Sequence, residues 1–411
     1  MENIVTDVAV IGGGASGLAC AIAFAQKNQN KKIVVFEALN RVGKKILATG
    51  NGKCNLSNSN ASPEHYHCSK KGFVDFALKK YDVNSNLDFF KNMSLLCYSD
   101  SFGRIYPSSN QANSVLDCLR FEAEKLGVDF VCDTHIDKIE KTQKGFILNN
   151  SISAKAVVIA TGGKSNSKQG SDGSGFKLLK QLGHSITPLF PALVQLDAKG
   201  DFFPALKGIR ATATATLIIN NKPIHTEKGE IQFTQRGLSG IAIMQLSSII
   251  ARAKSDNIKI RLDLADRFSE KELFDLLFSF SKSSPEQIIE NLLIGILPKR
   301  LGQVILKQSG YNSMSAKIGT LTKKDINNIV TALKAWDIKF SALQGFDVSQ
   351  VTSGGADTVE FYSDSMMSKK HENLYCIGEV LDVDGECGGY NLNWAWSSGR
   401  LAGEYIAERL K

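Results

Sequence analysis

The N-terminal part of the chain alternates apolar runs with a glycine-rich turn. Residues 8–11 are mostly apolar, residues 12–17 are rich in glycine, and residues 33–36 form a second apolar run. Short apolar runs that are bounded by turn residues are typical of buried strands. The pattern predicts a strand, a tight turn, a helix that opens at Leu18, and a second strand that ends at Glu37.

The turn has the spacing G-x-G-x-x-G, with glycines at Gly12, Gly14 and Gly17. The first glycine of this pattern makes the tight turn, the second lets the backbone approach a pyrophosphate, and the third lets the helix pack on the strand. The helix N-terminus offers free N–H groups to phosphate. Glu37 stands where a carboxylate accepts a hydrogen bond from a ribose 2′-hydroxyl. The stretch therefore predicts a dinucleotide-binding Rossmann unit.

The loop after Glu37 departs from a simple nicotinamide dehydrogenase. Residues 50–55 read Gly-Asn-Gly-Lys-Cys-Asn, and such a loop can wrap the second half of a dinucleotide. Cys54 has two interpretations, a thiol near a flavin or a small residue packed in a tight loop. The position five further on is Ser59, so a redox disulfide lacks its second cysteine.

The next segment mixes helices and strands. A helix is expected over residues 113–126, and the loop at residues 102–107 carries Arg104, which is either buried or substrate-facing. Short strands are expected at residues 129–132, 136–141, 146–149 and 156–159. Thr161 and Gly162 follow the last strand, and small residues there are the second signature of a flavin-binding Rossmann domain.

The middle of the chain has first a strand-like pattern of residues and then a helix-like one. Between about 191 and 264 alternating residues predict a small barrel or sandwich, with a functional loop at residues 233–240. Capping boxes at Ser269, Ser284 and Thr322 then predict helices. A strand pattern returns at residues 338–343.

The C-terminal segment supplies a second strong signal. A strand over residues 374–378 is followed by Glu379, and a helix begins near Gly389 and runs to Leu410. The acidic group can hold ribityl hydroxyls, while the helix N-terminus points N–H groups at the N1/O2 edge of a flavin and stabilises its anionic reduced ring. The two ends of the chain are therefore expected to build one FAD site.

These motifs resemble those of the BaiN/RdsA (YhiN-like) family of bacterial NAD(P)/FAD-dependent oxidoreductases. The resemblance covers nearly the whole chain and rests on the runs at residues 50–55, 351–356, 378–385 and 388–392. It implies an α/β fold, with a two-dinucleotide-binding-type Rossmann FAD domain, an inserted β-barrel domain and a helical domain inserted in the barrel. Two departures are Gln235, where many relatives have histidine, and Ile241, where proline is usual.

The expected domain boundaries follow from these strand and helix patterns and from the resemblance. The FAD-binding domain is predicted at residues 1–190 and 346–411. The barrel domain is predicted at residues 191–265 and 335–345, and the helical insert at residues 266–334.

The resemblance implies a set of residues that line FAD. They are Gly12, Gly14, Ser16, Gly17, Glu37, Lys44, Asn51, Gly52, Thr161, Gly162, Gly378, Glu379, Gly389 and Asn391. Their neighbours in the same motifs complete the predicted FAD-binding set: Ala15, Cys54, Asn55, Gly388, Tyr390 and Leu392.

A reduction by a flavin also requires a proton donor, and the sequence offers several candidates for it. Cys387 and Cys54 are the candidate catalytic residues, with Arg236 and Tyr390 as further possibilities. The competing interpretation of Cys387 is a residue small enough to fit beside two glycines. The six histidines form no pair at metal-ligand spacing, so no metal is expected.

The resemblance leaves the substrate open. Family members are linked to reduction of uridine to dihydrouridine in 23S ribosomal RNA, reduction of steroid enones, and oxidation of amino-ketones. The net charge of +8 suits a phosphate backbone, so hydride transfer from FAD to uridine in ribosomal RNA is the leading hypothesis. An FAD-holding RNA-binding or interaction protein without turnover is the alternative from another class.

Further expectations concern the reductant and the location. No second G-x-G-x-x-G is present, so NAD(P)H is expected to bind transiently over the flavin. The absence of an apolar run of about 18 residues and the cysteine pattern predict a cytoplasmic protein without a membrane partner. The sequence does not predict the oligomeric state.

Overall fold

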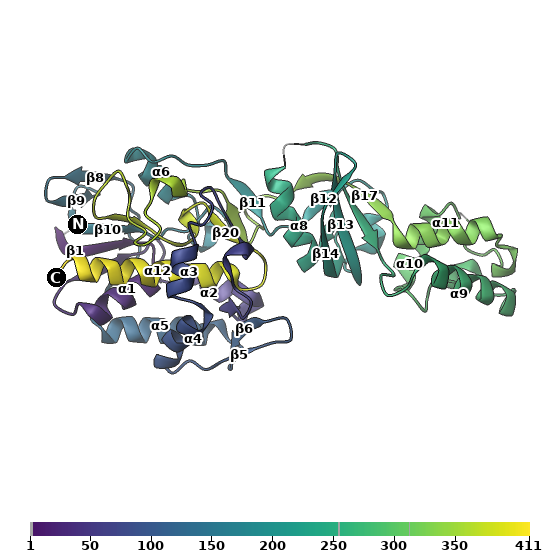
Figure 1. Cartoon of the computed structure of the whole chain (residues 1–411), viewed down its shortest axis with the longest axis horizontal. Helices are drawn as coiled ribbons and strands as arrows, with labels where there is room; N and C mark the ends of the chain where they lie inside the picture. Colours follow the sequence, from purple (N-terminus) through teal and green to yellow (C-terminus); the bar gives the residue numbers. More distant parts are fainter. Residues whose placement is uncertain (1–2, 254, 312) are drawn as a thin grey trace. The chain divides into compact units, whose positions relative to one another are not determined.

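The chain forms two compact units in a computed structural model, which describes residues 3–253, 255–311 and 313–411 (Figure 1). The first unit combines the described residues up to Pro191 with Phe346–Lys411, and the second is Ala192–Gly345. The chain therefore leaves the first unit once and returns to it once.

A seven-stranded sheet forms the centre of the first unit. Its order is β7-β2-β1-β10-β9-β8, and β19 pairs with the C-terminal half of β10. Five strands are parallel, whereas β9 and β8 run antiparallel to their neighbours. The bounds are β1 Ile4–Ile11, β2 Ile33–Phe36, β7 Asp129–Val131, β8 Ile139–Thr142, β9 Gly145–Leu148, β10 Ile152–Ile159 and β19 Leu374–Cys376.

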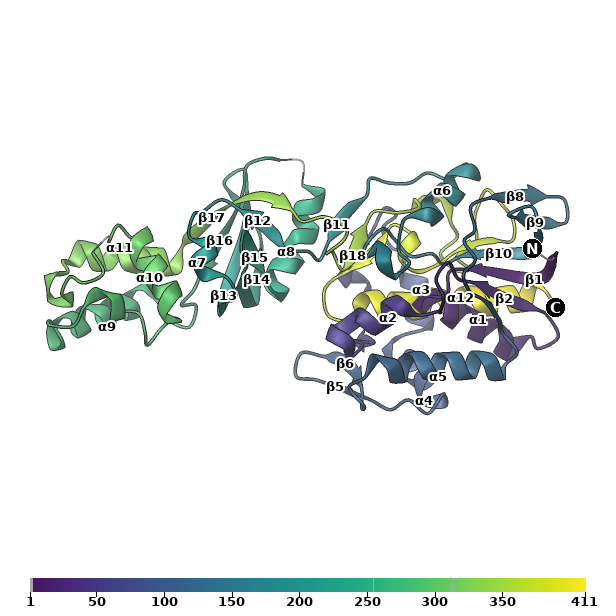
Figure 2. The same ribbon diagram turned by 180° about the vertical axis from the view of Figure 1, so that it is seen from behind.

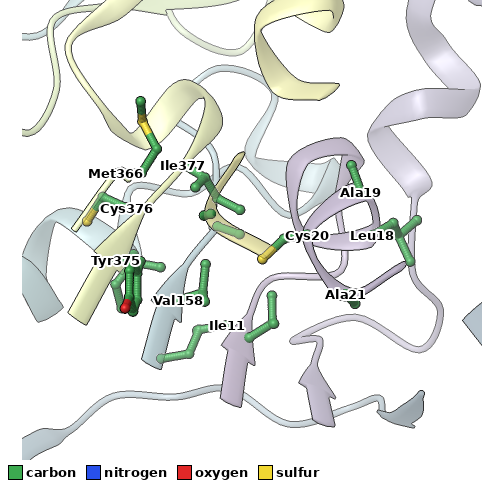
Figure 3. Close-up of a cluster of buried hydrophobic side chains, with 14 of the residues drawn as sticks. Ile11, Leu18, Ala19, Cys20, Ala21, Val158, Met366, Tyr375, Cys376 and Ile377 are labelled. Atoms are coloured by element: carbon green, nitrogen blue, oxygen red, sulfur yellow. The ribbon is translucent and has the colours of Figure 1, made fainter. Parts of the chain in front are cut away.

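Strands β2 and β19 are buried on both faces, and so are the C-terminal halves of β1 and β10. All four residues of β2 are buried, which explains why it reads as an unbroken apolar run rather than an alternating one. Figure 3 shows how Ile11 on β1, Val158 on β10 and Ile377 after β19 pack against α1 (Ala15–Lys27). The expected strand at residues 33–36 is confirmed, and α1 begins three residues before the expected Leu18.

Helix α12 (Tyr390–Arg409) lies against α1, as both views show (Figures 1 and 2). A Cβ on Gly399 would lie 2.4 Å from the carbonyl oxygen of Ser16, and a Cβ on Gly403 would lie 2.3 Å from that of Cys20. The two helices approach this closely only because both positions lack a side chain. The N-terminal and C-terminal parts of the chain thus pack against each other through the backbones of α1 and α12.

Further elements of the first unit surround the sheet. The helices are α2 Lys44–Ala48, α3 Asp75–Lys80, α4 Val83–Asn92, α5 Ala112–Lys125 and α6 Ser174–Gln181. The short strands are β3 Ser57–Asn58, β4 Tyr66–Cys68, β5 Cys97–Ser99, β6 Arg104–Pro107, β11 Phe190–Ala192, β18 Val351–Ser353 and β20 Val383–Gly385.

The second unit contains a closed antiparallel barrel of order β12-β15-β14-β13-β16-β17. The bounds are β12 Leu196–Ala198, β13 Arg210–Ile219, β14 Lys222–Phe233, β15 Gly237–Ser239, β16 Ile258–Asp263 and β17 Trp336–Leu343. Along β13, Ala213, Ala215 and Leu217 are buried while the intervening threonines are partly exposed. The segment expected as a functional loop contributes β15, which bridges β12 and β14.

Helices fill the rest of the second unit. They are α7 Phe203–Leu206, α8 Ile241–Arg252, α9 Glu270–Ser283, α10 Lys299–Gln308 and α11 Lys323–Lys334. The capping boxes at Ser269 and Thr322 are confirmed, because each side chain accepts from the backbone N–H three residues later. The predicted fold class is confirmed: a Rossmann FAD domain with an inserted β-barrel, and helices inserted between two strands of that barrel, β16 and β17.

The helix start expected at Ser284 is wrong. Ser284 instead follows the C-terminus of α9. The carbonyl oxygens of Pro285 and Gln287 accept hydrogen bonds from the backbone of Gly319 and Ile318, at 2.9 and 2.7 Å. These long-range backbone bonds replace the local bonds that a helix would need, so tertiary pairing overrides the capping signal.

Two features are absent from the residues that the structure describes. None of their helices combines the length and apolar character that crossing a bilayer requires. In the same part of the chain, no group of three or more His, Cys, Asp or Glu side chains is arranged to hold a metal ion.

Candidate functional site

The glycine-rich turn connects β1 to α1 and is shaped by close backbone contacts. Gly12 has φ +106°, and a Cβ there would lie 2.5 Å from the carbonyl oxygen of Ala160. A Cβ on Gly17 would lie 2.0 Å from the carbonyl oxygen of Gly12. Gly14 differs, because no atom lies within 4 Å of its Cβ position and the residue lines a cavity. The turn therefore presents open backbone where a ligand can approach.

Glu37 at the end of β2 is tied to this turn. Its Oε2 accepts a 2.9 Å hydrogen bond from the backbone of Gly13, and its Oε1 accepts one of 2.9 Å from the backbone of Leu39. The residue is only 8% exposed. Each oxygen keeps a further lone pair, so the fixed carboxylate can also accept from a ribose hydroxyl.

A cavity open to solvent lies in the first unit, next to the turn and Glu37, with about 1190 Å³ of empty space when its solvent-filled mouth is included. Three regions of the chain line it. The N-terminal region provides Gly12, Gly14, Ala15, Ser16, Glu37, Lys44, Lys45 and Thr49; the central region provides Thr134, His135, Ile136, Thr161, Gly162, Gln169, Gly170 and Ser171; the C-terminal region provides Gln350, Val351, Glu379, Val383, Asn391, Leu392, Trp394 and Ala395.

The polar groups of this cavity fit FAD. Helix α1 has Gly14 as its N-cap and no side-chain cap, so its first N–H groups are available to a pyrophosphate. The Oε1 atom of Gln169 is buried and has no hydrogen-bond partner among the described residues. A buried polar atom without a partner is costly, so a ligand donor at this position would be stabilising.

An ion pair connects the N-terminal and C-terminal walls of the cavity. The Nζ of Lys45 lies 2.7 Å from Oε2 of Glu379 and donates to Ser171 Oγ at 3.2 Å. The Oε1 of Glu379 accepts from the backbone of Thr352 at 2.8 Å. Both side chains are partly buried, so the pair fixes where the carboxylate stands.

The start of α12 forms another wall. Its N-cap is Gly389, without a side-chain cap, so the first N–H groups of α12 are available to a ligand. Asn391 organises the preceding loop, because its Oδ1 accepts from the backbone of Gly385 and its Nδ2 donates to the carbonyl oxygen of Gly385, both at 2.8 Å. Trp394 Nε1 donates to the carbonyl oxygen of Gly378 at 3.1 Å.

The structure brings eleven of the twenty predicted FAD-binding residues to the cavity wall. They are Gly12, Gly14, Ala15, Ser16, Glu37, Lys44, Thr161, Gly162, Glu379, Asn391 and Leu392. The other nine do not line it: Gly17, Asn51, Gly52, Cys54, Asn55, Gly378, Gly388, Gly389 and Tyr390. Gly17 and Gly378 instead lie against backbone or Ser16 in the packed turn, where they shape the wall from behind.

The two candidate catalytic cysteines occupy different environments. Cys54 is fully buried, and burial raises the pKa of its thiol to about 12. A thiol of this kind stays protonated and out of contact with a substrate. Cys387 is partly exposed, on the loop that precedes α12. The environment thus distinguishes two residues that the sequence treated alike.

Several cavity residues were not predicted. Thr134, His135 and Ile136 follow β7, which pairs with β2 in the parallel sheet. Ligands bind beyond the carboxyl ends of such strands, so the expected strand at residues 129–132 could have indicated them. Gln169 ends a short 3-10 turn (Ser167–Gln169) and Ser171 follows it, in a segment without a motif, so no signal in one sequence could have found them.

The family model of the HI0933-like protein Rossmann domain matches residues 6–405. The chain belongs to the HI0933-like family. The expected resemblance to BaiN and RdsA is confirmed, and with it a flavin-dependent oxidoreductase whose cofactor is FAD.

Two curated relatives align over almost the full length of this family member. The 3-dehydro-bile acid delta(4,6)-reductase of Clostridium scindens is 35% identical over 407 residues, which cover 98% of this chain and 99% of the relative. The ribosomal RNA dihydrouridine synthase of Haemophilus influenzae is 30% identical over 406 residues, which cover 97% and 96%.

Solved structures of lower identity share the fold. A mutant FrdA of E. coli quinol fumarate reductase has a TM-score of 0.51 at 17% identity, covering 100% of this chain and 71% of that chain. The 3-ketosteroid delta1-dehydrogenase of Sterolibacterium denitrificans has a TM-score of 0.50 at 12% identity, covering 98% and 100%.

Proposed function

We propose that this flavoenzyme is reduced by NAD(P)H and reduces the C5=C6 bond of a uridine in 23S ribosomal RNA. The names of the two curated relatives support the reaction class. A 3-dehydro bile acid with delta(4,6) unsaturation and a uridine both contain a C=C bond conjugated to a carbonyl. Reduction of such a bond is the chemistry common to both names.

The reaction needs a hydride and a proton. When bound and reduced, FAD would supply the hydride. The free N–H groups at the start of α12 stabilise negative charge near the cofactor, and the Lys45–Glu379 pair orients the carboxylate that would hold hydroxyls of the cofactor. Cys387, on the loop before α12, is the proposed donor of the proton to the neighbouring carbon.

The distribution of charge favours RNA as the substrate. The second unit contains 21 Lys and Arg against 14 Asp and Glu, a net charge of +7 in 154 residues, whereas the remaining 257 residues have a net charge of +1. Nearly all the excess positive charge is therefore in the inserted unit. A polyanion such as RNA is strongly attracted by such a unit, whereas a steroid with a single acidic group gains much less from it.

A deletion strain tests the substrate. Ribosomal RNA from a strain that lacks this gene should lose a dihydrouridine, and the wild-type chain should restore it. A Glu37→Ala variant should not restore it, because the fixed carboxylate of the FAD site is gone; Glu64→Ala, at an exposed carboxylate, should restore it. Unchanged dihydrouridine in the deletion strain would reject uridine as the substrate.

Steroid enone reduction is the second candidate, because the bile acid reductase is the more similar of the two curated relatives described above. The purified holoenzyme can be given NAD(P)H with either a 3-oxo-4,6-diene bile acid or unmodified ribosomal RNA. Turnover of the bile acid alone would replace the RNA proposal with this one.

The reductant is tested separately. Anaerobic stopped-flow absorbance should show bleaching of the bound flavin by NADH or NADPH. If neither nicotinamide reduces the flavin faster than it reduces free FAD, the proposed reductant is wrong.

A further inference from the structure

The β5–β6 hairpin of the first unit has one buried face and one outward face. Along β6, Ile105 and Pro107 are buried, whereas Arg104 and Tyr106 are partly exposed. Residues two apart in a strand share a face, so Arg104 and Tyr106 point to the same side. Tyr98 on β5 is directly opposite Tyr106 and shares that face.

Aromatic and guanidinium groups follow one another along the outward face. The rings of Tyr98 and Tyr106 are 6.1 Å apart between centroids, and Tyr106 and Arg104 interact electrostatically. The guanidinium carbon of Arg104 lies 5.0 Å from the ring centroid of Phe102, in the turn of the hairpin. We call Tyr98, Phe102, Arg104 and Tyr106 the hairpin strip.

The strip is fixed in place but open to solvent. Phe102 is 72% exposed and Tyr98 is 42% exposed. Asp100 holds the Arg104 side chain through two contacts, at 2.8 Å to Nε and 2.7 Å to Nη2. The hydroxyl of Tyr98 donates to Asn110 at 2.7 Å. Exposed aromatic rings held this way mark an interaction surface rather than a loose loop.

One end of the strip adjoins the loop that precedes α12. Asn58 on β3 pairs directly with Arg104, and its Nδ2 donates to the carbonyl oxygen of Gly388 at 3.0 Å. Arg104 and Tyr106 both interact electrostatically with Cys387. The strip is therefore linked, through Asn58, to the loop that carries the proposed proton donor.

We propose that the hairpin strip is a stacking surface for unpaired nucleobases of RNA next to the reacting uridine. The inference rests on the proposed function and adds a binding site to it. Bases of unpaired RNA stack on aromatic rings and on guanidinium planes, which are the groups that form the strip. A uridine inside a duplex is inaccessible, so an enzyme that reduces it has to hold the strand open.

The chemistry of the strip favours RNA over other occupants. A steroid needs an enclosed apolar pocket that buries most of its surface, whereas Phe102 and Tyr98 are open. A charged or polar ligand alone would not need three aromatic rings. The net charge of +7 in residues 192–345 of the same chain suits a polyanion that also contacts other surfaces.

Binding of RNA by the full-length holoenzyme tests the inference. A fluorescein-labelled oligouridylate is titrated with wild type and with a Tyr98→Ala/Phe102→Ala variant, and anisotropy is followed at several salt concentrations. The loss of stacking should weaken binding by about 5- to 150-fold per base. The dependence of affinity on salt should not change, because neither substitution removes a charge. Phe102→Trp should bind as tightly as wild type.

Phe121 offers a matched control. It is 60% exposed on α5, and the guanidinium carbon of Arg120 lies 5.9 Å from its ring centroid. Phe121→Ala removes a similar aromatic group from the same unit and should leave RNA binding unchanged. Wild type that does not bind oligouridylate, a double variant that binds like wild type, or an equal loss in Phe121→Ala would each overturn the inference.

The outcome is separable from that of the proposed function. If the wild-type chain restores dihydrouridine in the deletion strain while the double variant binds RNA normally, the stacking surface is wrong and the reaction stands. If binding falls in the double variant but dihydrouridine is never restored, the surface stands and the reaction is wrong.

Discussion

The Nζ of Lys45 lies 2.7 Å from Oε2 of Glu379, although the two residues are 334 positions apart in the chain. Each belongs to a different end of the polypeptide, and both line the cavity that fits FAD. The pair therefore connects the N-terminal and C-terminal parts of the chain within one site.

Removal of Lys45 should weaken both the fold and the cofactor site. In Lys45→Met, the partly buried Glu379 loses its cation, which should cost about 1.5–3 kcal/mol of the free energy of unfolding. FAD affinity should fall as well. Thermal unfolding and FAD titration measure the two effects, and Lys53→Met, at an exposed lysine of the neighbouring loop, is the control. The double variant Lys45→Met/Glu379→Gln should lose less than the sum of the single variants.

Glu37→Gln should weaken FAD binding while the protein stays folded. The carboxylate accepts one backbone hydrogen bond on each oxygen, whereas an amide would direct its NH₂ group at one of the two N–H donors. The one unsatisfied donor should lower FAD affinity by about 5- to 150-fold. Quenching of FAD fluorescence on the apoprotein measures this. Equal affinity in Glu37→Gln and wild type would show that Glu37 does not organise the site.

Substitutions at two glycines of the turn should affect folding and FAD binding separately. Gly14→Ala introduces a Cβ into open space at an ordinary φ of −80°, so the variant should unfold at the wild-type temperature but retain little FAD. Gly17→Ala places a Cβ 2.0 Å from a carbonyl oxygen and should lower the unfolding temperature itself. Circular dichroism and flavin absorbance distinguish the two. The idea fails if Gly14→Ala binds FAD normally.

Acid should destabilise the chain through a buried pair outside the site. Nδ1 of His184 lies 2.6 Å from Oε2 of Glu360, and Nζ of Lys370 lies 2.7 Å from Oε1. Burial lowers the pKa of His184. Burial alone would raise the pKa of Glu360, but hydrogen bonds from Lys370, Ser185 and His184 together outweigh burial and lower this pKa to about 2.

Both folded-state pKa values are below the unfolded ones, so the unfolded chain binds more protons in acid. The stability from this pair is complete above the ordinary pKa of histidine, about 6.5, and is lost as the pH falls from there toward 2. The unfolding temperature of wild type should therefore decrease below neutral pH. His184→Gln should be less stable at neutral pH and show a shallower decrease between about pH 7 and pH 5. An identical slope in both proteins would contradict this account.

The two candidate cysteines should differ in kinetics. Cys387→Ala should leave flavin reduction by NAD(P)H intact and slow reoxidation by the C=C substrate by about 10²- to 10⁴-fold, the usual contribution of a positioned acid. Cys54→Ala should change neither rate, because the Cys54 thiol is buried. Separate stopped-flow measurements of the two half-reactions test both statements. Normal reoxidation in Cys387→Ala would remove it as the donor.

Periodicity in the sequence was enough to predict the elements whose burial is regular. The alternation of alanine and threonine in β13 and the unbroken apolar run in β2 both reflect which faces are buried. Ser284 shows the limit, because its capping signal is local while its segment is fixed by backbone bonds to Gly319 and Ile318. A single sequence contains no record of such partners.

The cofactor site could be predicted where a motif fixes the backbone, as at Gly12 and Glu37. Gln169 could not, because its role depends on a short 3-10 turn without a motif that folds back to the cavity. The sequence allows Arg104 to be either buried or substrate-facing, and the structure shows it partly exposed and paired with Asp100. Whether a side chain faces a ligand depends on the strand partner, which the local pattern does not contain.

The contact between α1 and α12 through Gly399 and Gly403 affects how hybrids of this family can be made. A hybrid that takes only its first or only its last segment from a relative would combine two helix surfaces that were never fitted to each other. Residues 192–345 are one continuous segment of the chain, so they can be exchanged as a cassette without changing the sequence on either side of that helix contact. Such an exchange between a bile acid reductase and a dihydrouridine synthase would reveal how far the inserted unit dictates substrate choice.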